Sequence, residues 1–484
     1  MIKNTTEYVS KTIGMAHQDE FMRNHKDRTY FGIFWEMGVG KSKALVDNIG
    51  HLYCSGQIDG AIIVSDAGCY EGLANEFKKH LPSTIPISLA IHSSSMNRSE
   101  QAAVETIMTA QDNRLDILLM NVEGFSGDKS KTVAYRFIQS HYILFAIDEA
   151  TSIKNIKAKR TQNLLMLARQ TDYRRILTGT PITRSPLDVY AMCEFLSPGC
   201  LGHSTFSGFR SQYAMLQLIR FGKGKPFHQV IGYRNLNHLG DVMSHFCSRK
   251  KKEECIDLPE KVYEEVTVPF TDKQRQLYDQ LRQQAFVLHE QGLLTVTSAV
   301  TAINKLQQIC CGHMKLDDGT IVHIDSNRVK SLVELLEKIG QKTVVWCAFR
   351  EDVKLIMAAL KGREEYAVDF YGDTVDRRDS LSRFMTDPKC MWWVGTTSTG
   401  GKGIDGLQNV CSYQVYFSNT YNLEDRLQSE DRLHRRGQEN KVTVIDMAIP
   451  KTIDVKILVN LKSKKDLASQ VLSNFKELVM EQVN

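Results

Sequence analysis

The sequence predicts an α/β protein with two parallel-sheet lobes and a mainly helical insertion between them, and three observations support this prediction. Short apolar runs alternate with helical patterns in the first third of the chain, a second series of such runs begins near residue 342, and the stretch between the two series is poor in strands. Continuous apolar runs are typical of strands that helices cover on both faces. Strands that alternate with helices in this way build α/β lobes.

The expected elements follow in chain order. The first series of apolar runs predicts strands at 29–35, 60–65, 115–121, 142–147 and 173–179, and the second series predicts strands at 342–349, 365–371, 391–397, 412–418 and 441–449. The stretch between them contains the helical run TDKQRQLYDQLRQQAFVLHEQ and a basic, glycine-bearing loop, RFGKGKPFHQVIGYRN. We therefore expect a first lobe over 1–184, a helical insertion and linker over 185–320, and a second lobe with C-terminal brace helices over 321–484.

The composition is that of an ordinary globular protein. The chain has 484 residues, of which 42% are hydrophobic and 24% charged, and this length suffices for two or three domains. No apolar run approaches the roughly 18 residues of a membrane span, and the N-terminal sequence lacks the apolar core of a secretory signal. The net charge of +5 permits a nucleic-acid partner without indicating one. The local charged runs SRKKKEE and RLHRRGQ are more informative than the net charge, although most such runs are solvated surface faces.

The cysteines do not indicate a metal site. The eleven cysteines are scattered, and none forms a CxxC pair. Cys310, Cys311 and His313 lie close together in QQICCGH, but no second pair of ligands stands at the spacing of a zinc site. Reduced cysteines in an intracellular, cytoplasmic protein are the simpler interpretation.

The segment WEMGVGKSKALV, which follows the first predicted strand, has the residues of a phosphate-binding loop. Gly38 and Gly40 allow a tight turn that brings backbone N–H groups close to phosphate oxygens, at the positive end of the helix that follows. Lys41 can reach the β- and γ-phosphates of a nucleotide, and Ser42 can ligate Mg²⁺. Trp35 stands where the usual pattern has its first glycine, so a glycine-rich turn that binds no phosphate is the alternative.

Two adjacent acids, Asp148 and Glu149, follow the apolar run YILFAI. On their own they could bind a metal, cleave a glycosidic bond or lie at the positive end of a helix. A phosphate-binding loop needs a second carboxylate at a neighbouring strand end to hold Mg²⁺, and a base to position water. We therefore expect Asp148 to ligate Mg²⁺ together with Ser42, and Glu149 to act as the base.

These segments, in this order, resemble the Swi/Snf-type ATPases of helicase superfamily 2, from Gln18 to about Leu472. EMGVGKS resembles the first motif of that family, IDEATSIKN its acidic box, LTGTPI its third motif and GTTSTGGKGIDGLQ its fifth. QSEDRLHRRGQ is similar to the sixth motif of Swi/Snf-type proteins and unlike that of RNA-remodelling DEAD-box helicases. Two features depart from the family pattern: Thr151 stands where His is usual, and SDAGCYEGLANEF lacks the usual proline.

The resemblance implies two RecA-like lobes that sandwich ATP with Mg²⁺. It also implies that Arg435, with Arg432 beside it, is an arginine finger from the second lobe, because such a group stabilises charge on the transferring phosphoryl. The residues implied in ATP binding are Gln18, which would read adenine, and Met37, Gly38, Val39, Gly40, Lys41, Ser42 and Gln428. The residues implied in coupling hydrolysis to DNA are Thr178, Gly179, Thr180, Thr396, Thr397, Gly400 and Gly401.

The function implied is an ATP-dependent DNA translocase or helicase-like motor that moves along or remodels double-stranded or branched DNA without sequence preference. The alternatives are a nucleotide-switched nucleic-acid-binding protein without processive motor activity, and a P-loop phosphotransferase. The complete set Lys41, Asp148, Glu149 and Arg435 disfavours the first alternative, and the second lobe disfavours the other. The chain resembles compact, motor-only bacterial or viral members of the family, which implies a cytoplasmic protein, in the host if viral, and identifies no recruiting protein.

Overall fold

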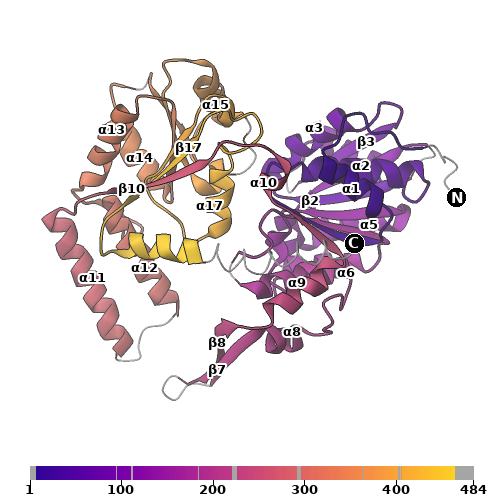
Figure 1. Ribbon diagram of the computed structural model, residues 1–484, viewed down its shortest axis with the longest axis horizontal. Coiled ribbons are helices and arrows are strands. Elements are labelled where there is room, and N and C mark those ends of the chain that lie inside the picture. The colour runs from indigo at the N-terminus through magenta and orange to yellow at the C-terminus, as the bar shows by residue number, and fades with distance from the viewer. Residues whose placement is uncertain are drawn as a thin grey trace. The chain divides into compact units, whose positions relative to one another are not determined.

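The computed structural model describes residues 7–93, 95–110, 113–183, 185–220, 226–290, 296–363, 365–401, 404 and 406–463. The chain divides into two compact units. Met1–Gln217 and Gln229–Asp257 belong to the first unit, and Leu258–Lys465 belongs to the second, with which Leu218–His228 is grouped. Each unit is built around one parallel sheet (Figure 1). The predicted fold of two parallel-sheet lobes is thereby confirmed.

The sheet of the first unit has the strand order β3-β4-β2-β5-β6-β1-β9. Its strands are β1 (Tyr30–Trp35), β2 (Gly60–Ser65), β3 (Ile87–His92), β4 (Leu115–Asn121), β5 (Ile143–Asp148), β6 (Tyr173–Leu177) and β9 (Cys247–Lys250). All of these neighbouring strands pair in parallel. The carboxyl ends of β1, β5 and β6 therefore meet at one edge of the sheet.

Helices cover both faces of this sheet, as the continuous apolar runs predict. The α-helices of the first unit are α1 (Ala16–Asn24), α2 (Lys41–Cys54), α3 (Tyr70–His80), α4 (Arg98–Thr106), α5 (Asp128–Ser140), α6 (Lys159–Ala168), α7 (Val189–Leu196), α8 (Phe206–Tyr213), α9 (Leu236–Ser244) and α10 (Lys252–Cys255), and the 3₁₀ turns are η1 (Ala67–Cys69), η2 (Val122–Ser126), η3 (Ala150–Ile153) and η4 (Pro186–Asp188). On β1, Ile33 and Trp35 lie in one hydrophobic cluster and Phe34 in another. Successive strand side chains point to opposite faces, so each face has its own core.

The sheet of the second unit has the strand order β10-β17-β16-β13-β15-β14, again parallel. Its strands are β10 (Lys261–Thr267), β13 (Thr343–Cys347), β14 (Ala367–Phe370), β15 (Trp392–Thr396), β16 (Tyr413–Tyr416) and β17 (Val442–Ala448). Its helices are α11 (Asp272–Glu290), α12 (Val296–Cys311), α13 (Asn327–Ile339), α14 (Arg350–Ala359), α15 (Arg377–Thr386), α16 (Thr397–Gly400), α17 (Leu423–Glu430) and the 3₁₀ turn η5 (Leu407–Asn409). Residues 453–463 are also helical. The brace helices expected after residue 463 lie outside the described residues.

The stretch 185–320, expected to be mainly helical, also contributes strands. It supplies β9 to the first sheet and β10 to the second, and it forms the small pair β7 (Ala214–Ile219) with β8 (Phe227–Tyr233). Its last strand, β11 (His313–Lys315), pairs with β12 (Ile321–His323), which begins directly after this stretch. Sequence patterns missed β9 because its four residues, CSRK, include two charges and make no apolar run. The division of the chain at residues 184 and 320 stays a prediction.

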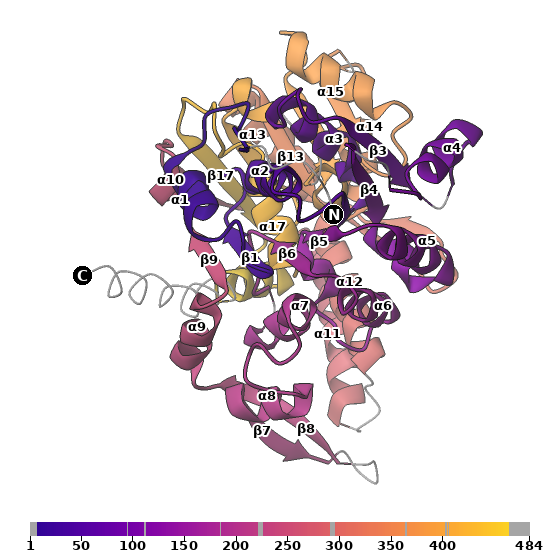
Figure 2. The same ribbon diagram turned by 90° about the vertical axis from the view of Figure 1, so that its right-hand side faces the viewer.

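The residues 221–225 of the basic loop lie outside the described part of the chain, but their flanks form the ribbon β7–β8, which leads away from α8 and α9 (Figure 2). Within the described residues, no helix combines the length and the apolar character that a membrane crossing requires.

Candidate functional site

The loop between β1 and α2 has the backbone of a phosphate-binding site. Gly38 and Gly40 have φ angles of 77° and 82°, in the left-handed region that favours glycine. Among the described residues, no side chain caps the N-terminus of α2, and the first turn of α2 holds no acid. The N–H groups of that turn and the positive end of the helix dipole are therefore available to an anion.

Lys41, the first residue of α2, directs its side chain into this loop. The side chain is buried, and its Nζ donates to the carbonyl oxygens of Trp35 at 3.1 Å and Glu36 at 3.4 Å. The ammonium group is thus held beside the backbone that would surround a phosphate. Ser42 follows it and is partly exposed.

Two residues of α1 form hydrogen bonds with the backbone of this loop. Nε2 of His17 donates to the carbonyl oxygen of Val39 at 2.8 Å, and burial lowers the pKa of His17, which favours the neutral ring. The Gln18 amide donates from Nε2 to the carbonyl of Gly40 at 3.0 Å and accepts at Oε1 from the N–H of Met15 at 2.8 Å. Gln18 therefore positions the loop backbone here, and its expected role in reading adenine stays a prediction. The sequence analysis did not single out His17, although this residue stands next to Gln18 in the chain.

The two predicted carboxylates lie at the carboxyl end of β5. Asp148 pairs in register with Leu177 of β6, and its Oδ1 accepts from the N–H of Glu149 at 3.1 Å. Burial raises the pKa of Asp148, while the charge of Lys41 lowers it in part and that of Asp66 raises it further. The Asp148 carboxyl and the Lys41 ammonium thus share one local environment, as a phosphate and Mg²⁺ site requires.

Glu149 has an unusual backbone. Its φ of 48° and ψ of 59° lie in the left-handed region, which is sparsely populated by residues other than glycine and costs about 1–3 kcal/mol. Oε2 of Glu149 accepts from the Thr178 hydroxyl at 3.4 Å. Because such strain persists only where the surroundings impose it, the backbone at this position supports a specific role for the carboxylate.

The third motif, after β6, joins the acid pair to the loop. The buried Thr178 hydroxyl also accepts from the N–H of Thr180 at 3.1 Å. Gly179 packs against the loop so closely that a Cβ atom there would lie 3.2 Å from the backbone nitrogen of Met37. All the predicted residues of the first unit are therefore gathered at one edge of its sheet.

A partly buried arginine on β9, Arg249, also lies at this edge, and the sequence analysis did not single it out. Nη1 of Arg249 donates to the carbonyl oxygens of Phe34 at 2.9 Å and Gly179 at 3.3 Å, and its Nη2 donates to Oε1 of Glu36 at 2.8 Å. Burial lowers the pKa of the Arg249 guanidinium, and the Glu36 carboxylate opposes this shift. The backbone N–H of Lys252 donates to the other oxygen of Glu36 at 2.9 Å. The run SRKKKEE is thus partly internal rather than a solvated face.

In the second unit, the predicted coupling residues lie where β15 turns into α16. Thr396 ends β15, Thr397 begins α16, and both are buried. A Cβ atom at Gly400 would lie 2.3 Å from the Trp393 ring, so only glycine fits that position without a shift. The next residue, Gly401, presents its carbonyl oxygen to the sixth motif.

Arg432 uses its guanidinium to hold this turn. Nε and Nη2 donate to the carbonyl of Gly401 at 3.0 and 2.7 Å, and Nη1 donates to the carbonyl of Ile404 at 2.6 Å. Arg435 lies three residues further along the chain and is half-buried. The buried Gln428 donates from Nε2 to Oε1 of Glu424 at 3.4 Å. The catalytic and ATP-binding roles expected for these three residues stay predictions.

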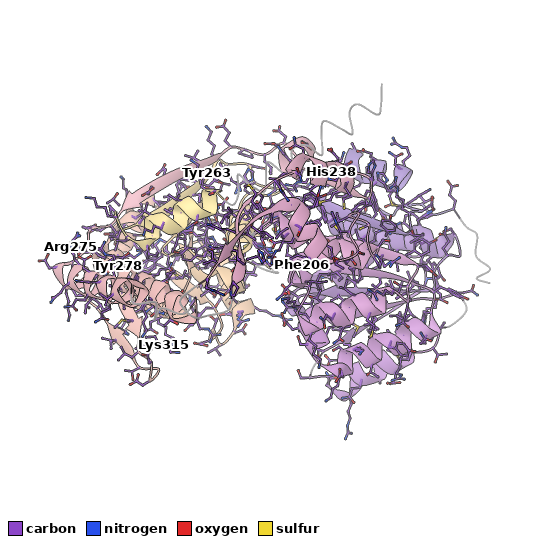
Figure 3. All side chains as sticks on the ribbon, turned by 90° about the horizontal axis from the view of Figure 1, so that it is seen from below. Phe206, His238, Tyr263, Arg275, Tyr278 and Lys315 are labelled. Carbon is purple, nitrogen blue, oxygen red and sulfur yellow. The ribbon has the colours of Figure 1, made fainter. Side chains whose placement is uncertain are left out.

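The linker strand β10 contacts the same sixth motif. The Lys261 ammonium lies 3.1 Å from Oε2 of Glu430, and the Tyr263 hydroxyl donates to that oxygen at 2.8 Å (Tyr263 is labelled in Figure 3). Nε2 of His434 donates to the carbonyl of Pro259 at 2.8 Å. The residues on either side of Arg432 are therefore fixed by the segment that leads from one unit to the other.

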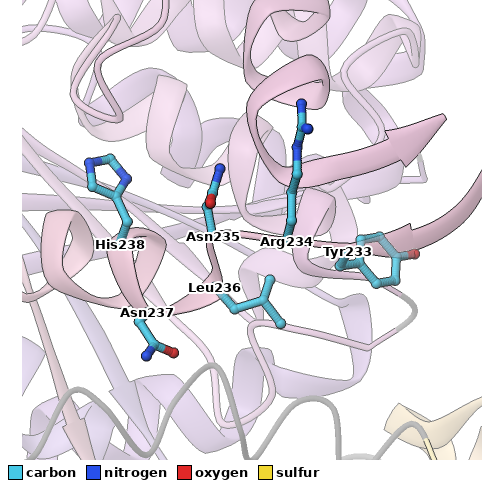
Figure 4. Close-up of a pocket in the computed structure, with 6 residues that line it drawn as sticks. All are labelled: Tyr233, Arg234, Asn235, Leu236, Asn237 and His238. Atoms are coloured by element: carbon cyan, nitrogen blue, oxygen red, sulfur yellow. The ribbon is translucent and has the colours of Figure 1, made fainter.

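A hollow of about 490 Å³ lies elsewhere, at the base of β8 (Figure 4). It is lined by Tyr233, Arg234, Asn235, Leu236, Asn237 and His238. None of the residues of the phosphate-binding loop lines it, so we do not assign the nucleotide to this hollow.

The comparisons with known proteins agree with these motifs. A family model described as the SNF2-related domain matches residues 20–315. The chain is 24% identical over 458 residues to the SWI/SNF chromatin-remodeling complex subunit snf22 of Schizosaccharomyces pombe. This match covers 90% of this chain and 26% of that protein. It is 23% identical over 341 residues to the putative ATP-dependent helicase/translocase YwqA of Bacillus subtilis. That match covers 68% of this chain and 35% of that protein.

Among solved structures, the SWI2/SNF2 ATPase core of Sulfolobus solfataricus in complex with dsDNA is similar at 20% sequence identity and a TM-score of 0.42, over 98% of this chain and 96% of that chain. The two curated relatives named above are longer proteins, and this chain spans 26% and 35% of their lengths.

Proposed function

Because this chain belongs to the SNF2-related family, we propose that it is an ATP-dependent motor that moves along or remodels double-stranded or branched DNA. The observation that carries the proposal is the gathering of Lys41, Asp148, Glu149 and Thr178 at the carboxyl edge of the first sheet. That edge combines an uncapped helix N-terminus with a lysine, two carboxylates and a hydroxyl, the set that nucleotide hydrolysis needs.

The residues of this edge fit ATP and Mg²⁺. The first turn of α2 and Lys41 would bind the β- and γ-phosphates. Ser42 and Asp148 would ligate Mg²⁺, whose charge favours the ionised form of a carboxyl that burial disfavours. Glu149, held through Thr178, would accept a proton from the attacking water.

The second unit would supply the finger and part of the DNA grip. We assign the finger to Arg435 and a positioning role to Arg432, whose guanidinium already has carbonyl partners. Gln428 would belong to the ATP-binding surface. Thr396, Thr397, Gly400 and Gly401 would contact DNA or couple to it, as Thr178, Gly179 and Thr180 would in the first unit. Contacts to phosphates carry no sequence information, so we expect binding without sequence preference.

We place the protein in a reducing, intracellular compartment. All eleven cysteines lie in the described part of the chain, none of them is joined in a disulfide there, and most of them are buried. Thiols of this kind persist where disulfides do not form.

The experiment that tests the proposal is ATP turnover by the wild type and by Glu149→Gln, measured without nucleic acid and with single strands, duplex, forks and RNA. We expect DNA to stimulate the wild type, and the Gln variant to bind ATP but not to hydrolyse it, because an amide cannot take the proton of water. Glu365→Gln, a surface change outside the site, is the matched control and should behave as the wild type.

Normal hydrolysis by Glu149→Gln would show that the base is assigned to the wrong residue. A wild type that binds ATP but does not hydrolyse it with any nucleic acid would favour the nucleotide-switched binding protein instead.

A further inference from the structure

One long segment of the chain carries positive charges and no negative ones. From Phe195 to Gly240 the sequence has 46 residues with five Lys or Arg and no Asp or Glu, whereas the whole chain has 56 acidic residues in 484. The described part of this segment includes the end of α7, α8, β7, β8 and the first half of α9. A segment that carries basic residues and no carboxylate has a net positive charge of its own, which favours contact with a polyanion.

The strands β7 and β8 form a two-stranded ribbon. Only seven residues, 220–226, connect them. A parallel pair would need a crossover of about a dozen residues or more, so the two strands run antiparallel as a hairpin.

This ribbon exposes large apolar side chains on both faces. Met215 and Leu218 are 42% and 60% exposed, and their odd spacing along β7 places them on opposite faces. Ile231 on β8 is 59% exposed. An isolated two-stranded ribbon is marginally stable in water, and exposed apolar surface of this kind is typical of a binding site. The ribbon therefore offers exposed apolar side chains on a segment whose own net charge is positive.

The base of the ribbon is fixed. Nη2 of Arg234, directly after β8, donates to the carbonyl of Ser211 on α8 at 2.6 Å. The hydroxyl of the buried Tyr213 lies 2.9 Å from Nδ1 of His238 on α9, and Figure 4 shows His238 on the helix that follows Tyr233 and Arg234. The exposed part of the ribbon is thus presented by two helices of the first unit rather than by a loose loop.

We propose that the ribbon β7–β8 binds DNA at a branch point or duplex end, a proposal that rests on the proposed function and names its substrate class. An intact duplex covers the flat faces of its bases by stacking, whereas a branch point or an end exposes them. Leu218 and Ile231 can pack on such faces, as apolar wedges do between base steps. Arg220, exposed at the end of β7, can pair with the adjoining phosphates.

The test compares a forked duplex with covalently closed circular duplex, which has neither ends nor forks. Binding and ATP turnover are measured with both DNAs for the wild type and for Leu218→Ser combined with Ile231→Ser. The wild type should bind the fork more tightly. The double variant should lose about tenfold in affinity for the fork, the scale of one lost base contact, and keep its affinity for the circle within about twofold.

The matched control is Val9→Ser combined with Val459→Ser, two exposed apolar residues outside the ribbon. It should bind both DNAs as the wild type does. Both sites in the ribbon are exposed, so the variant should melt at the temperature of the wild type, which separates lost binding from lost folding.

Unchanged fork binding by the double variant would overturn the proposal and make the ribbon a surface for a protein partner. An equal loss on fork and circle would overturn the preference for branch points. Either result leaves the proposed function in place as long as DNA stimulates ATP turnover. If the wild type binds none of the DNAs and none of them stimulates its ATP turnover, the proposed function itself is contradicted. The ribbon proposal then fails as well.

Discussion

Trp35 stands where the phosphate-loop pattern has its first glycine, and the surroundings of its side chain account for the difference. The indole is fully buried, its Nε1 donates to the hydroxyl of Ser248 at 2.7 Å, and its ring meets that of His17 edge-on at 4.7 Å. Trp35 therefore belongs to the core under the loop, while Gly38 and Gly40 make the turn. The sequence indicated the turn, but it could not indicate the partner of Trp35, which lies on a strand added much later in the chain.

Arg249→Met should lower turnover more than nucleotide affinity. Methionine fills a similar volume but donates no hydrogen bond, so the carbonyl oxygens of Phe34 and Gly179 and the carboxylate of Glu36 lose a hydrogen-bond donor. A small displacement of the loop can cost on the order of 10²-fold in rate, while the phosphate-binding groups themselves remain. The measurements are steady-state turnover and nucleotide affinity of the same preparation.

Two further variants sharpen this test of Arg249. Arg249→Lys can restore one of the lost contacts and should recover part of the turnover. Arg136→Met, which breaks an exposed pair with Glu105, is the control and should change neither quantity. If turnover and affinity of Arg249→Met fall together, in step with a lower melting temperature, Arg249 only stabilises the fold.

At the scale of the elements, the segment from β9 to β10 contacts, at each of its ends, a motif that we expect to take part in nucleotide binding. At β9 it contacts the phosphate-binding loop through Arg249, and at β10 it contacts the sixth motif through Lys261 and Tyr263. The ten strands predicted from apolar runs are all present, because both faces of those strands are buried. By contrast, β9 and β10 lie at sheet edges and carry charged residues, so their patterns resemble loops.

Inserting Gly-Ser between Asp257 and Leu258 should uncouple the two ends of this linker. The insertion adds about 7 Å of slack at full extension and leaves every contact named above in place. We expect nucleotide affinity to stay as in the wild type and DNA-stimulated turnover to fall by about tenfold or more, because closure of the two units would no longer be aligned by a linker of fixed length.

The control for this linker variant is the same Gly-Ser insertion after Gly319, in the exposed turn between β11 and β12, which should leave turnover unchanged. Full DNA-stimulated turnover in the linker variant would show that the linker is a passive connection.

At the scale of the whole molecule, the sequence predicted two parallel-sheet units because continuous apolar runs are typical of parallel strands that helices cover on both faces. It also predicted that Lys41 and Asp148 would lie close together, because a phosphate-binding loop needs a carboxylate from a neighbouring strand end. The supporting contacts of His17, Gln18 and Arg249 could not be predicted, since each depends on backbone carbonyls whose positions follow from the folded loop rather than from a residue pattern.

The measurement that tests the two-lobe motor most directly is DNA-stimulated ATP turnover of Arg435→Ala and Arg435→Lys, made together with nucleotide affinity. Affinity should stay nearly intact in both variants, because Lys41, Ser42 and Asp148 remain. Turnover of Arg435→Ala should drop by about 10³–10⁵-fold, the measured worth of such fingers. Arg435→Lys should recover little of it, because an ammonium lacks the planar fork of a guanidinium.

The neighbouring exposed residue supplies the control, since Arg436→Ala removes the same charge from the same motif. It should hydrolyse ATP as the wild type does, with at most weaker DNA binding. Turnover of Arg435→Ala far below that of Arg436→Ala, at equal nucleotide affinity, is the result that we predict. Near-wild-type hydrolysis by Arg435→Ala would contradict a motor in which the second unit completes the ATP site.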